Sequence, residues 1–224
     1  MADSQESKLP EPEAAAEDVE NLAPRLVKVA AHTAIAFGLF DGARRALGTV
    51  GDIPEDARQV ALGYRGDAVS MAVVRLVLLL DSDPKIVSFQ SIYRHLKRPE
   101  VVDALVQRGC SKSLLAEVLS DRTGREIRDS VERFLAVYRA IDWDDLHGRL
   151  QHFRNRGLAH LTPEEIEKRV TYAEIESLVR SISILAESLM PFYQNGKAVR
   201  VDEIAEWSDR AKSVWDAMLR NLEK

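Results

Sequence analysis

The sequence predicts an all-α fold, and three observations support this prediction. Apolar residues recur at helical spacing through most of the 224 residues. No segment alternates apolar and polar side chains as a half-buried strand does, and no Asn-Gly turn is flanked by two strand-like runs. Helix start and stop signals divide the chain into helix-sized segments. We therefore expect a helical bundle with long antiparallel helices.

The first two predicted helices are long enough to be members of such a bundle. One covers about residues 24–47, with Pro24 in its first turn and Gly48 after its end. The other covers about residues 54–80 and ends at an Asp-Ser-Asp-Pro breaker whose last residue is Pro84.

The middle of the chain is the least regular part. Between residues 85 and 124 the apolar runs are short, and Pro99, Gly109 and Gly124 separate them. We expect two or three small helices here, which form an insertion or cap on the bundle. A longer helix over about residues 125–140 follows, with these apolar residues at helical spacing: Ile127, Val131, Phe134, Leu135 and Tyr138.

The next predicted helix begins after Asp142 or Asp144, either of which can cap it. It ends at about His160, because Thr162 and residues 163–165 form a capping box with proline at the first position of a further helix.

The last two predicted helices each carry an apolar stripe for packing. In the long helix after Thr162 the stripe repeats in alternate steps of four and three residues. A C-terminal helix over about residues 201–222 carries a second stripe, which can pack in the core or in a dimer. The first stripe is Leu178, Ile182, Leu185, Leu189 and Phe192, and the second is Ile204, Trp207, Ala211, Val214, Met218 and Leu222.

Composition limits the class of protein. Residues 1–20 are acidic and lack the basic start and apolar run of a signal peptide, so we expect a disordered tail followed by one helical domain over residues 21–224. The most apolar run, residues 73–80, contains Arg75 and is far shorter than the ~20 residues of a membrane-spanning helix. With no membrane segment and a single cysteine, Cys110, we expect a cytoplasmic protein.

One short segment combines a permanent cation with a titratable base. Arg154 and His160 lie on the same predicted helix, and Asn155 adds a polar side chain beside the arginine. A guanidinium binds phosphate through a planar fork of donors, and an imidazole exchanges protons near neutral pH. Together the two groups can cleave a phosphodiester without a metal ion. The last carbonyls of the helix favour the protonated form of His160.

The geometry of an intact helix separates these two groups. Arg154 and His160 lie ~9 Å apart along the axis and ~120° apart around it, so one helix cannot easily bring both to one phosphate. Two copies with their motif helices antiparallel about a two-fold axis bring Arg154 of one chain to His160 of the other.

A structural role for His160 is the alternative. His160 lies close to the predicted buried stripe of its helix, where a hydrogen-bonded histidine at the edge of the core also fits. The spacing alone does not decide, because Arg25 and His32 have a similar separation in an apolar helix, where we expect His32 to be a core residue. The buried stripe is Leu146, Leu150, Phe153, Gly157 and Leu161.

The segment Leu150-Gln-His-Phe-Arg-Asn-Arg-Gly-Leu-Ala-His160 resembles the motif of HEPN domains (higher eukaryotes and prokaryotes nucleotide-binding), in which an arginine and a polar residue precede a spacer and a histidine. More narrowly, the chain resembles the AbiU-type HEPN group, named for phage abortive infection. In that group a helix with an arginine, a leucine-rich run and an aspartate, here residues 75–81, precedes a short helix that starts with serine, here residues 88–92. The similarity covers roughly residues 24–194.

The resemblance implies a dimeric helical bundle that acts as a metal-independent endoribonuclease in phage defence or in a toxin–antitoxin system. It assigns Arg154 to stabilising the phosphorane, Asn155 to orienting the substrate or the histidine, and His160 to general acid or base catalysis. Attack by the ribose 2′-hydroxyl then leaves a 2′,3′-cyclic phosphate. We expect the neighbouring Arg149 and Arg156 to bind the RNA, which can be a tRNA or an mRNA.

An antitoxin protein is a further expected partner. Some HEPN toxins carry a tyrosine two residues after the histidine, which a nucleotidyltransferase antitoxin modifies, but the corresponding residue here is Thr162. Control by that route is therefore not expected.

Other site classes have less support, and we expect neither a metal ion nor a cofactor. The chain has no Walker loop, nucleophile elbow or dinucleotide fingerprint. An acidic and histidine-containing segment lacks metal-ligand spacing, and Asp145 is placed to pair with Arg149 one turn later. The members of that segment are Asp142, Asp144, Asp145, His147 and His152.

A second function class also fits the sequence. The formal net charge of −5 gives no overall attraction for nucleic acid, so any RNA contact depends on a local basic patch or on a partner. The same fold can therefore serve as a non-catalytic module that dimerises and binds RNA, a nucleotide or a protein.

Overall fold

The computed structural model describes residues 10–49, 53–83, 85–112, 116–143, 145–155, 170–192 and 203–221. These residues are almost entirely helical and contain no strand, which confirms the predicted all-α fold. The elements are α1 (Pro12–Leu47), α2 (Glu55–Leu79), α3 (Phe89–Leu96), α4 (Pro99–Lys112), α5 (Ala116–Ala140), α6 (Leu146–His152), α7 (Tyr172–Ser188), the short 3-10 helix η2 (Met190–Phe192) and α8 (Glu203–Arg220).

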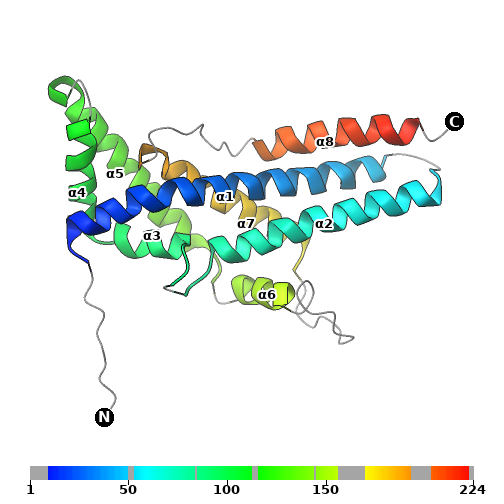
Figure 1. Cartoon of the computed structure of the whole chain (residues 1–224), viewed down its shortest axis with the longest axis horizontal. Coiled ribbons are helices and arrows are strands. Elements are labelled where there is room, and N and C mark those ends of the chain that lie inside the picture. Colours follow the sequence, from blue (N-terminus) through cyan, green and yellow to red (C-terminus); the bar gives the residue numbers. More distant parts are fainter. Residues whose placement is uncertain are drawn as a thin grey trace, which may run out of the picture.

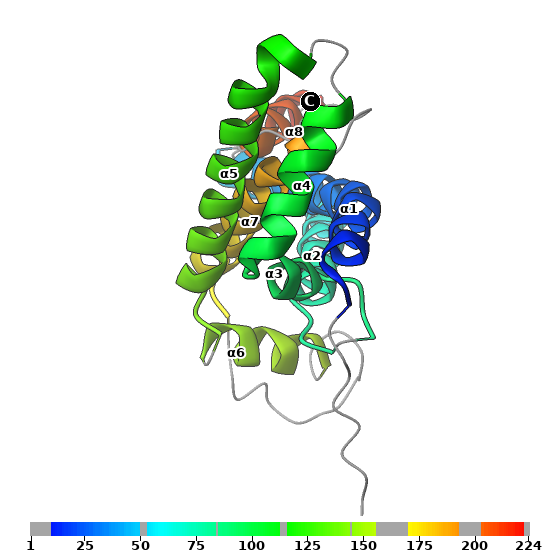
Figure 2. The same cartoon turned by 90° about the vertical axis from the view of Figure 1, so that its left-hand side faces the viewer.

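Three long helices form one layer of the molecule. α1 lies between α8 and α2 along the long axis, and α7 lies behind this layer (Figure 1). At the N-terminal end of α1, the helices α3 and α4 pack across it, and α5 packs on α4 and α7. α6 lies beneath α2 in Figure 1 and below the lower end of α5 in Figure 2.

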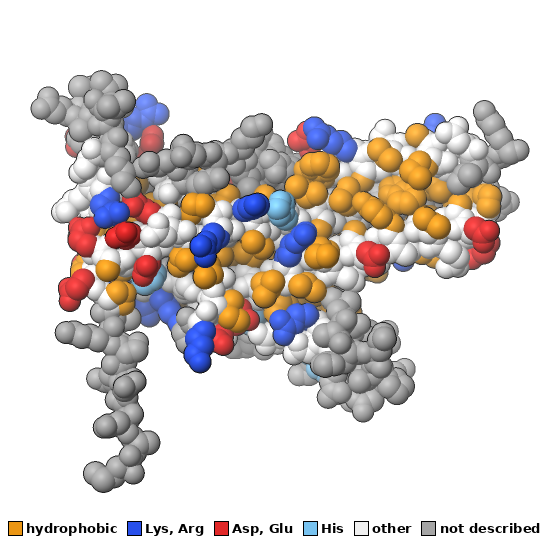
Figure 3. Space-filling model, in the orientation of Figure 1, with side chains coloured by type: hydrophobic (Ala, Val, Ile, Leu, Met, Phe, Trp, Pro, Cys, Tyr) orange, Lys and Arg blue, Asp and Glu red, His pale blue; other side chains and the backbone are white. Residues whose placement is uncertain are grey.

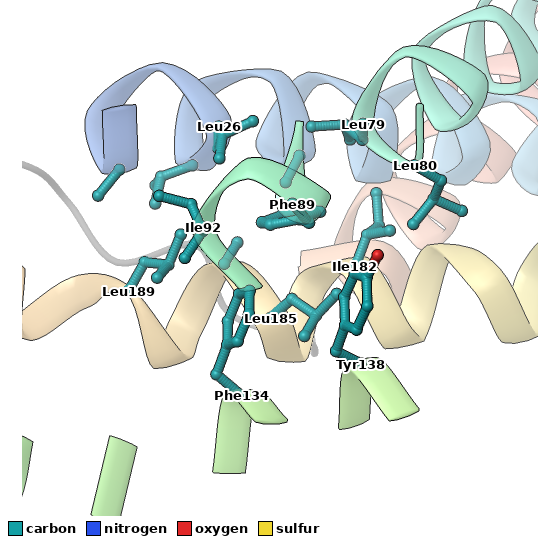
Figure 4. Close-up of a cluster of buried hydrophobic side chains, with 14 of the residues drawn as sticks. Leu26, Leu79, Leu80, Phe89, Ile92, Phe134, Tyr138, Ile182, Leu185 and Leu189 are labelled. Carbon is teal, nitrogen blue, oxygen red and sulfur yellow. The ribbon is translucent and has the colours of Figure 1, made fainter. Parts of the chain in front are cut away.

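The hydrophobic core lies where these helices meet. Phe89 and Ile92 of α3 are surrounded by side chains of α1, α2, α5 and α7 (Figure 4). The rings of Phe89 and Phe134 are tilted, with centroids 6.0 Å apart. The predicted stripe of α7 lies in this core, because Leu178, Ile182, Leu185, Leu189 and Phe192 are all buried. That packing prediction is confirmed.

The first helix begins well before its predicted start at about residue 24. It begins at Pro12, so residues 12–20, which were expected to belong to a disordered tail, are helical. Ala15, Ala16 and Val19 are fully buried and continue the apolar stripe of α1 against the core. Acidic side chains occupy the other faces, and Glu20 accepts a hydrogen bond from Arg108 of α4 at 2.8 Å. Burial of the small apolar face stabilises this segment in spite of its charge.

The expected insertion over residues 85–124 is also corrected. Gly109 lies inside α4 and Gly124 inside α5, so neither glycine ends a helix, and α5 begins at Ala116 instead of about residue 125. A Cβ on Gly109 would lie 2.5 Å from Cδ1 of Ile127, so this glycine allows α4 and α5 to approach closely. α3, α4 and α5 contribute residues to the main core, and are therefore part of the bundle.

The C-terminal helix lies against α1 through only part of the predicted stripe, because Ile204 and Ala211 are buried as expected but other described members are not. Val214 and Met218 are 58% and 51% exposed, whereas Ser208 and Leu219 are buried. The cause is a close approach at Gly42 of α1, where an added Cβ would lie 2.5 Å from the carbonyl oxygen of Ser208. Small side chains are needed at such a contact, and Ser208 and Ala211 provide them. The buried residues of α8 are Ile204, Ser208, Ala211 and Leu219, and Leu222 lies outside the described residues.

The end of α1 at Leu47, the whole of α2 and the bounds of α8 agree with the sequence to within two residues. The helix expected to run on from Thr162 is corrected, because residues 170 and 171 are not helical and α7 begins at Tyr172 after the cap at Thr171. Among the described residues one helix, α1, is long and apolar enough by composition to span a membrane, and 61% of the window that meets this criterion is buried in the bundle. Buried core helices and signal sequences near an N-terminus both meet the same criterion.

Candidate functional site

The described part of the motif lies on and just after α6. Asp142 precedes this helix, and its Oδ1 accepts a hydrogen bond from the backbone N–H of Asp145 at 3.1 Å. The predicted cap at Asp142 is wrong, because Asp145 is the residue directly before α6 and its side chain makes no capping hydrogen bond, and Asp144 lies outside the described residues. Leu150 is fully buried, and Leu146 and Phe153 pack against the core. The described members of the predicted α6 stripe therefore face the bundle, which fixes the rotation of the helix about its axis.

A buried histidine fixes α6 to the end of α2. The ring of His147 lies edge-on to Trp143, with centroids 5.2 Å apart. Burial lowers the pKa of His147, while the Asp81 carboxylate and a hydrogen bond with the Leu80 backbone act in the opposite direction. Within the described residues its Nε2 has no hydrogen-bond partner. The neutral ring is therefore favoured, and it packs chiefly as an apolar group.

In the sequence, His147 stands out only as a member of the acidic and histidine-containing segment that lacks metal-ligand spacing. The signal that identifies its packing role is its position three residues before Leu150, on the apolar face of α6.

Arg149, one of the two expected RNA-binding arginines, joins α6 to α7. Its guanidinium donates to Glu174 Oε1 at 2.6 Å and to Asp145 Oδ2 at 2.9 Å. The predicted pair with Asp145 is confirmed, whereas the pair with Glu174 depends on the tertiary fold. Two carboxylates on one guanidinium compete with any phosphate for the same donors.

Glu174 also completes the start of α7. The backbone N–H of Glu174 donates to Oγ1 of Thr171, and the Glu174 carboxylate accepts from the backbone N–H of Thr171 at 2.7 Å. The hydrogen bond from Arg149, together with the bonds from Thr171, lowers the pKa of Glu174 to about 2. α7 thus begins with a capping box at Thr171, and the capping box predicted at Thr162 lies outside the described residues.

Arg154 and Asn155 follow α6 in a π-helical turn over residues 153–155. Nε and Nη2 of Arg154 both donate to Oδ1 of Asn155, at 2.9 and 2.7 Å. The arginine is half-buried and the asparagine exposed. In the described part of the chain, no ion pair involves Arg154. An amide acceptor orients the guanidinium without neutralising its charge, so Arg154 can still bind an anion through its remaining donors.

The other expected motif residues are Arg156, His160 and the stripe members Gly157 and Leu161, and they lie outside the described residues. The end of the motif helix near His160 lies there too. Of the three expected catalytic residues, the structure therefore describes Arg154 and Asn155, which it brings together.

Searches for other site chemistry and for relatives give no further assignment. In the described ranges, no group of three or more His, Cys, Asp and Glu side chains is placed to hold a metal ion. No family model, curated protein or solved structure matches the chain.

Proposed function

We propose that this protein is a metal-independent endoribonuclease of HEPN type that acts in phage defence or in a toxin–antitoxin system. The observation that carries the proposal is the guanidinium of Arg154, which is oriented by Asn155 and keeps its positive charge just after α6. The π-helical turn around them is consistent with a functional site, because such turns occur frequently at such sites. We place the activity in the cytoplasm, with an RNA substrate and no cofactor.

The proposed reaction is an in-line displacement at phosphorus. The ribose 2′-hydroxyl attacks the adjacent phosphate, the P–O5′ bond breaks, and the products carry a 2′,3′-cyclic phosphate and a 5′-hydroxyl. His160 takes the proton of the 2′-hydroxyl or gives one to the leaving oxygen. Arg154 stabilises the charge that develops on the non-bridging oxygens, and Asn155 positions the guanidinium. Arg156 is proposed to bind the RNA backbone beside them.

The site is proposed to be shared between two copies of the chain. Arg154 and His160 are too far apart on one intact helix to act easily on one phosphate. A two-fold symmetric pair supplies an arginine from one copy and a histidine from the other, twice.

A non-catalytic binding module is the second candidate function. One specific observation favours it: Arg149 is bound to Glu174 and Asp145, which reduces the positive charge next to Arg154. In a chain of net charge −5, this leaves a weak electrostatic attraction for RNA. The module would dimerise and bind RNA, a nucleotide or a protein.

The deciding experiment is cleavage of defined RNA and tRNA in the presence of EDTA, with chemical identification of the product ends. We expect cyclic-phosphate ends from the wild type and none from His160→Ala or Arg154→Ala. Arg122→Ala is the matched control, because Arg122 is an exposed arginine of α5 that pairs only with Glu126 in the described structure, and it should cleave like the wild type. A folded wild-type protein that binds RNA without cutting it would support the binding module.

The proposed toxin role has a separate test in cells. Induced expression of the wild type should stop growth, whereas His160→Ala at an equal soluble level should not. Equal growth of both strains would contradict an active toxin, and an antitoxin partner would then have no activity to neutralise.

A further inference from the structure

One face of α2 carries an unusual share of the exposed apolar surface. Eight large apolar side chains are exposed in the described chain, and four of them lie on α2. Val60, Tyr64, Met71 and Leu78 are 66%, 39%, 49% and 43% exposed. Hydrophobic side chains cover the same region of α1, α2 and α8 in the space-filling view (Figure 3). Contiguous apolar patches of this kind are uncommon on monomers and mark interaction surfaces.

The spacing of these residues is that of a helix-packing seam. Residues 60, 64, 67, 71, 74 and 78 follow one another in steps of four, three, four, three and four. Such alternation keeps one stripe of a helix facing a neighbouring helix. The stripe lies outside the packing with α1, because the buried side chains of α2 are Ala61, Ala72, Val73, Leu76, Val77 and Leu79.

A groove beside the stripe extends the face onto α1. Its volume is about 440 Å³, and its walls include Ile35 and Leu39 of α1 as well as Tyr64 and Met71 of α2. His32 also lines the groove and is exposed, so the expectation of a core histidine at that position is wrong. A long helix laid along α2 would fill this groove with its side chains.

Two oppositely charged side chains indicate which molecule binds in the groove. Asp67 and Arg75 line the same groove, four residues before and four residues after Met71, or ~6 Å along the helix in each direction. If a second α2 packs antiparallel about a two-fold axis at Met71, Asp67 of each copy faces Arg75 of the other. A parallel pair would place like charges together, which disfavours association.

We infer that this face, built from the α2 stripe and the adjoining groove of α1, binds a second copy of the same chain. The copies pack antiparallel, with Met71 at the two-fold axis, Tyr64 opposite Leu78 of the partner copy and two reciprocal pairs of Asp67 with Arg75. Arg75 is already held in position, because its Nη1 donates to the carbonyl oxygen of His32 at 2.9 Å.

This arrangement also bears on the motif. α6 runs from beneath α5 toward α2, so its C-terminal end lies on the side of the inferred interface (Figure 2). A two-fold axis across α2 keeps both α6 helices on the same side of the dimer. The relevance of this arrangement to the motif rests on the proposed function, whereas the interface itself rests on the exposed stripe and the charges alone.

The first test is sedimentation equilibrium of the full chain over micromolar concentrations. The wild type should dimerise, and Met71→Lys should weaken dimerisation by about a hundredfold or more, because the new charge would be buried against its own copy at the axis. Val87→Lys is the control, since Val87 precedes α3, is also an exposed apolar residue at 39%, and belongs neither to the stripe nor to the groove, so it should leave dimerisation unchanged.

A charge exchange tests the antiparallel register. Asp67→Arg alone and Arg75→Asp alone should each be monomeric, because each places like charges in both pairs. An equimolar mixture of the two variants should form the heterodimer, since both pairs are then opposite in sign. The double variant Asp67→Arg/Arg75→Asp should dimerise on its own. Circular dichroism spectra like that of the wild type establish that each variant is folded.

Several outcomes would overturn the inference. A wild type that is monomeric at micromolar concentration excludes a second copy as the occupant, and leaves another partner for the face. A dimer that Met71→Lys leaves intact, or single variants that fail to associate when mixed, places the interface elsewhere. The cleavage assay separates this result from the proposed function: a Met71-dependent dimer without RNase activity would retain the interface and reject the enzyme.

Discussion

The guanidinium of Arg149 and the carboxylate of Glu174 form a hydrogen bond of 2.6 Å that ties the helix before the motif to the start of α7. This pair fixes the segment that carries Arg154 by a contact between residues 25 positions apart in the chain. It also links the position of the motif to the protonation of one carboxylate.

The Glu174 carboxylate should make the stability of the folded protein decrease at acid pH. Because the pKa of Glu174 is lowered to about 2 in the folded protein, its contribution to stability is complete above its usual pKa near 4.5. The contribution is lost as the pH falls from there toward 2. The wild type should therefore be more stable than Glu174→Gln at pH 7, and the difference between their melting temperatures should shrink from pH 5 to pH 2.

A nearby substitution provides the control for this comparison. Glu176→Gln removes an exposed carboxylate of the same helix that pairs with Arg180, and such surface pairs contribute little. If the difference between the melting temperatures of Glu174→Gln and the wild type stays the same down to pH 2, the assigned role of Glu174 is contradicted.

Protonation of His147 should make the folding stability depend on pH in a second range, closer to neutral pH. Burial lowers its pKa, so below about pH 6.5 the unfolded chain binds a proton that the folded chain does not. Stability then falls with decreasing pH until the lowered pKa is reached, in spite of the nearby Asp81 carboxylate. In His147→Leu, the free energy of unfolding measured in urea should change less between pH 7 and pH 5 than in the wild type. An equal change with pH in both proteins would show that His147 does not titrate in this way.

The contact between α1 and α8 should be intolerant of a single methyl group. Gly42→Ala places a Cβ 2.5 Å from the Cβ of Ala211, so α8 must shift or detach. We expect a loss of about 1–3 kcal/mol in the free energy of unfolding. Gly66→Ala in α2 is the control, because nothing lies within 4 Å of its added Cβ, and it should stabilise by about 0.5–1 kcal/mol. Equal effects of the two substitutions would refute the close packing.

Arg154 should require the shape of its side chain as well as its charge, if the proposed function holds. Arg154→Lys keeps the cation but loses the planar fork that binds Asn155 and two phosphate oxygens. We expect kcat for RNA cleavage to fall by about 10²-fold, with a smaller change in KM. Activity of Arg154→Lys close to that of the wild type would mean that a point charge is sufficient.

Local sequence signals were enough to predict much of the fold. The periodicity of apolar residues predicted the α2 boundaries and the buried stripe of α7, because each depends on residues within two turns of one another. The i,i+4 pair of Asp145 with Arg149 follows from the same geometry. The hydrogen bonds of Arg154 with Asn155 likewise join neighbours in the chain, whereas the role of these residues in a catalytic site stays a prediction.

The sequence by itself determined that this chain is helical, where α2 and the end of α1 lie, and which residues line the face of α7. Only the tertiary structure decided which residues of α8 are buried, because its close approach to α1 at Gly42 buries Ser208 and leaves Val214 of the predicted stripe exposed. It also decided that residues 12–20 are helical, since their small apolar face is stabilised by distant helices. In both cases the deciding contact joins residues far apart in the chain, which local periodicity does not specify.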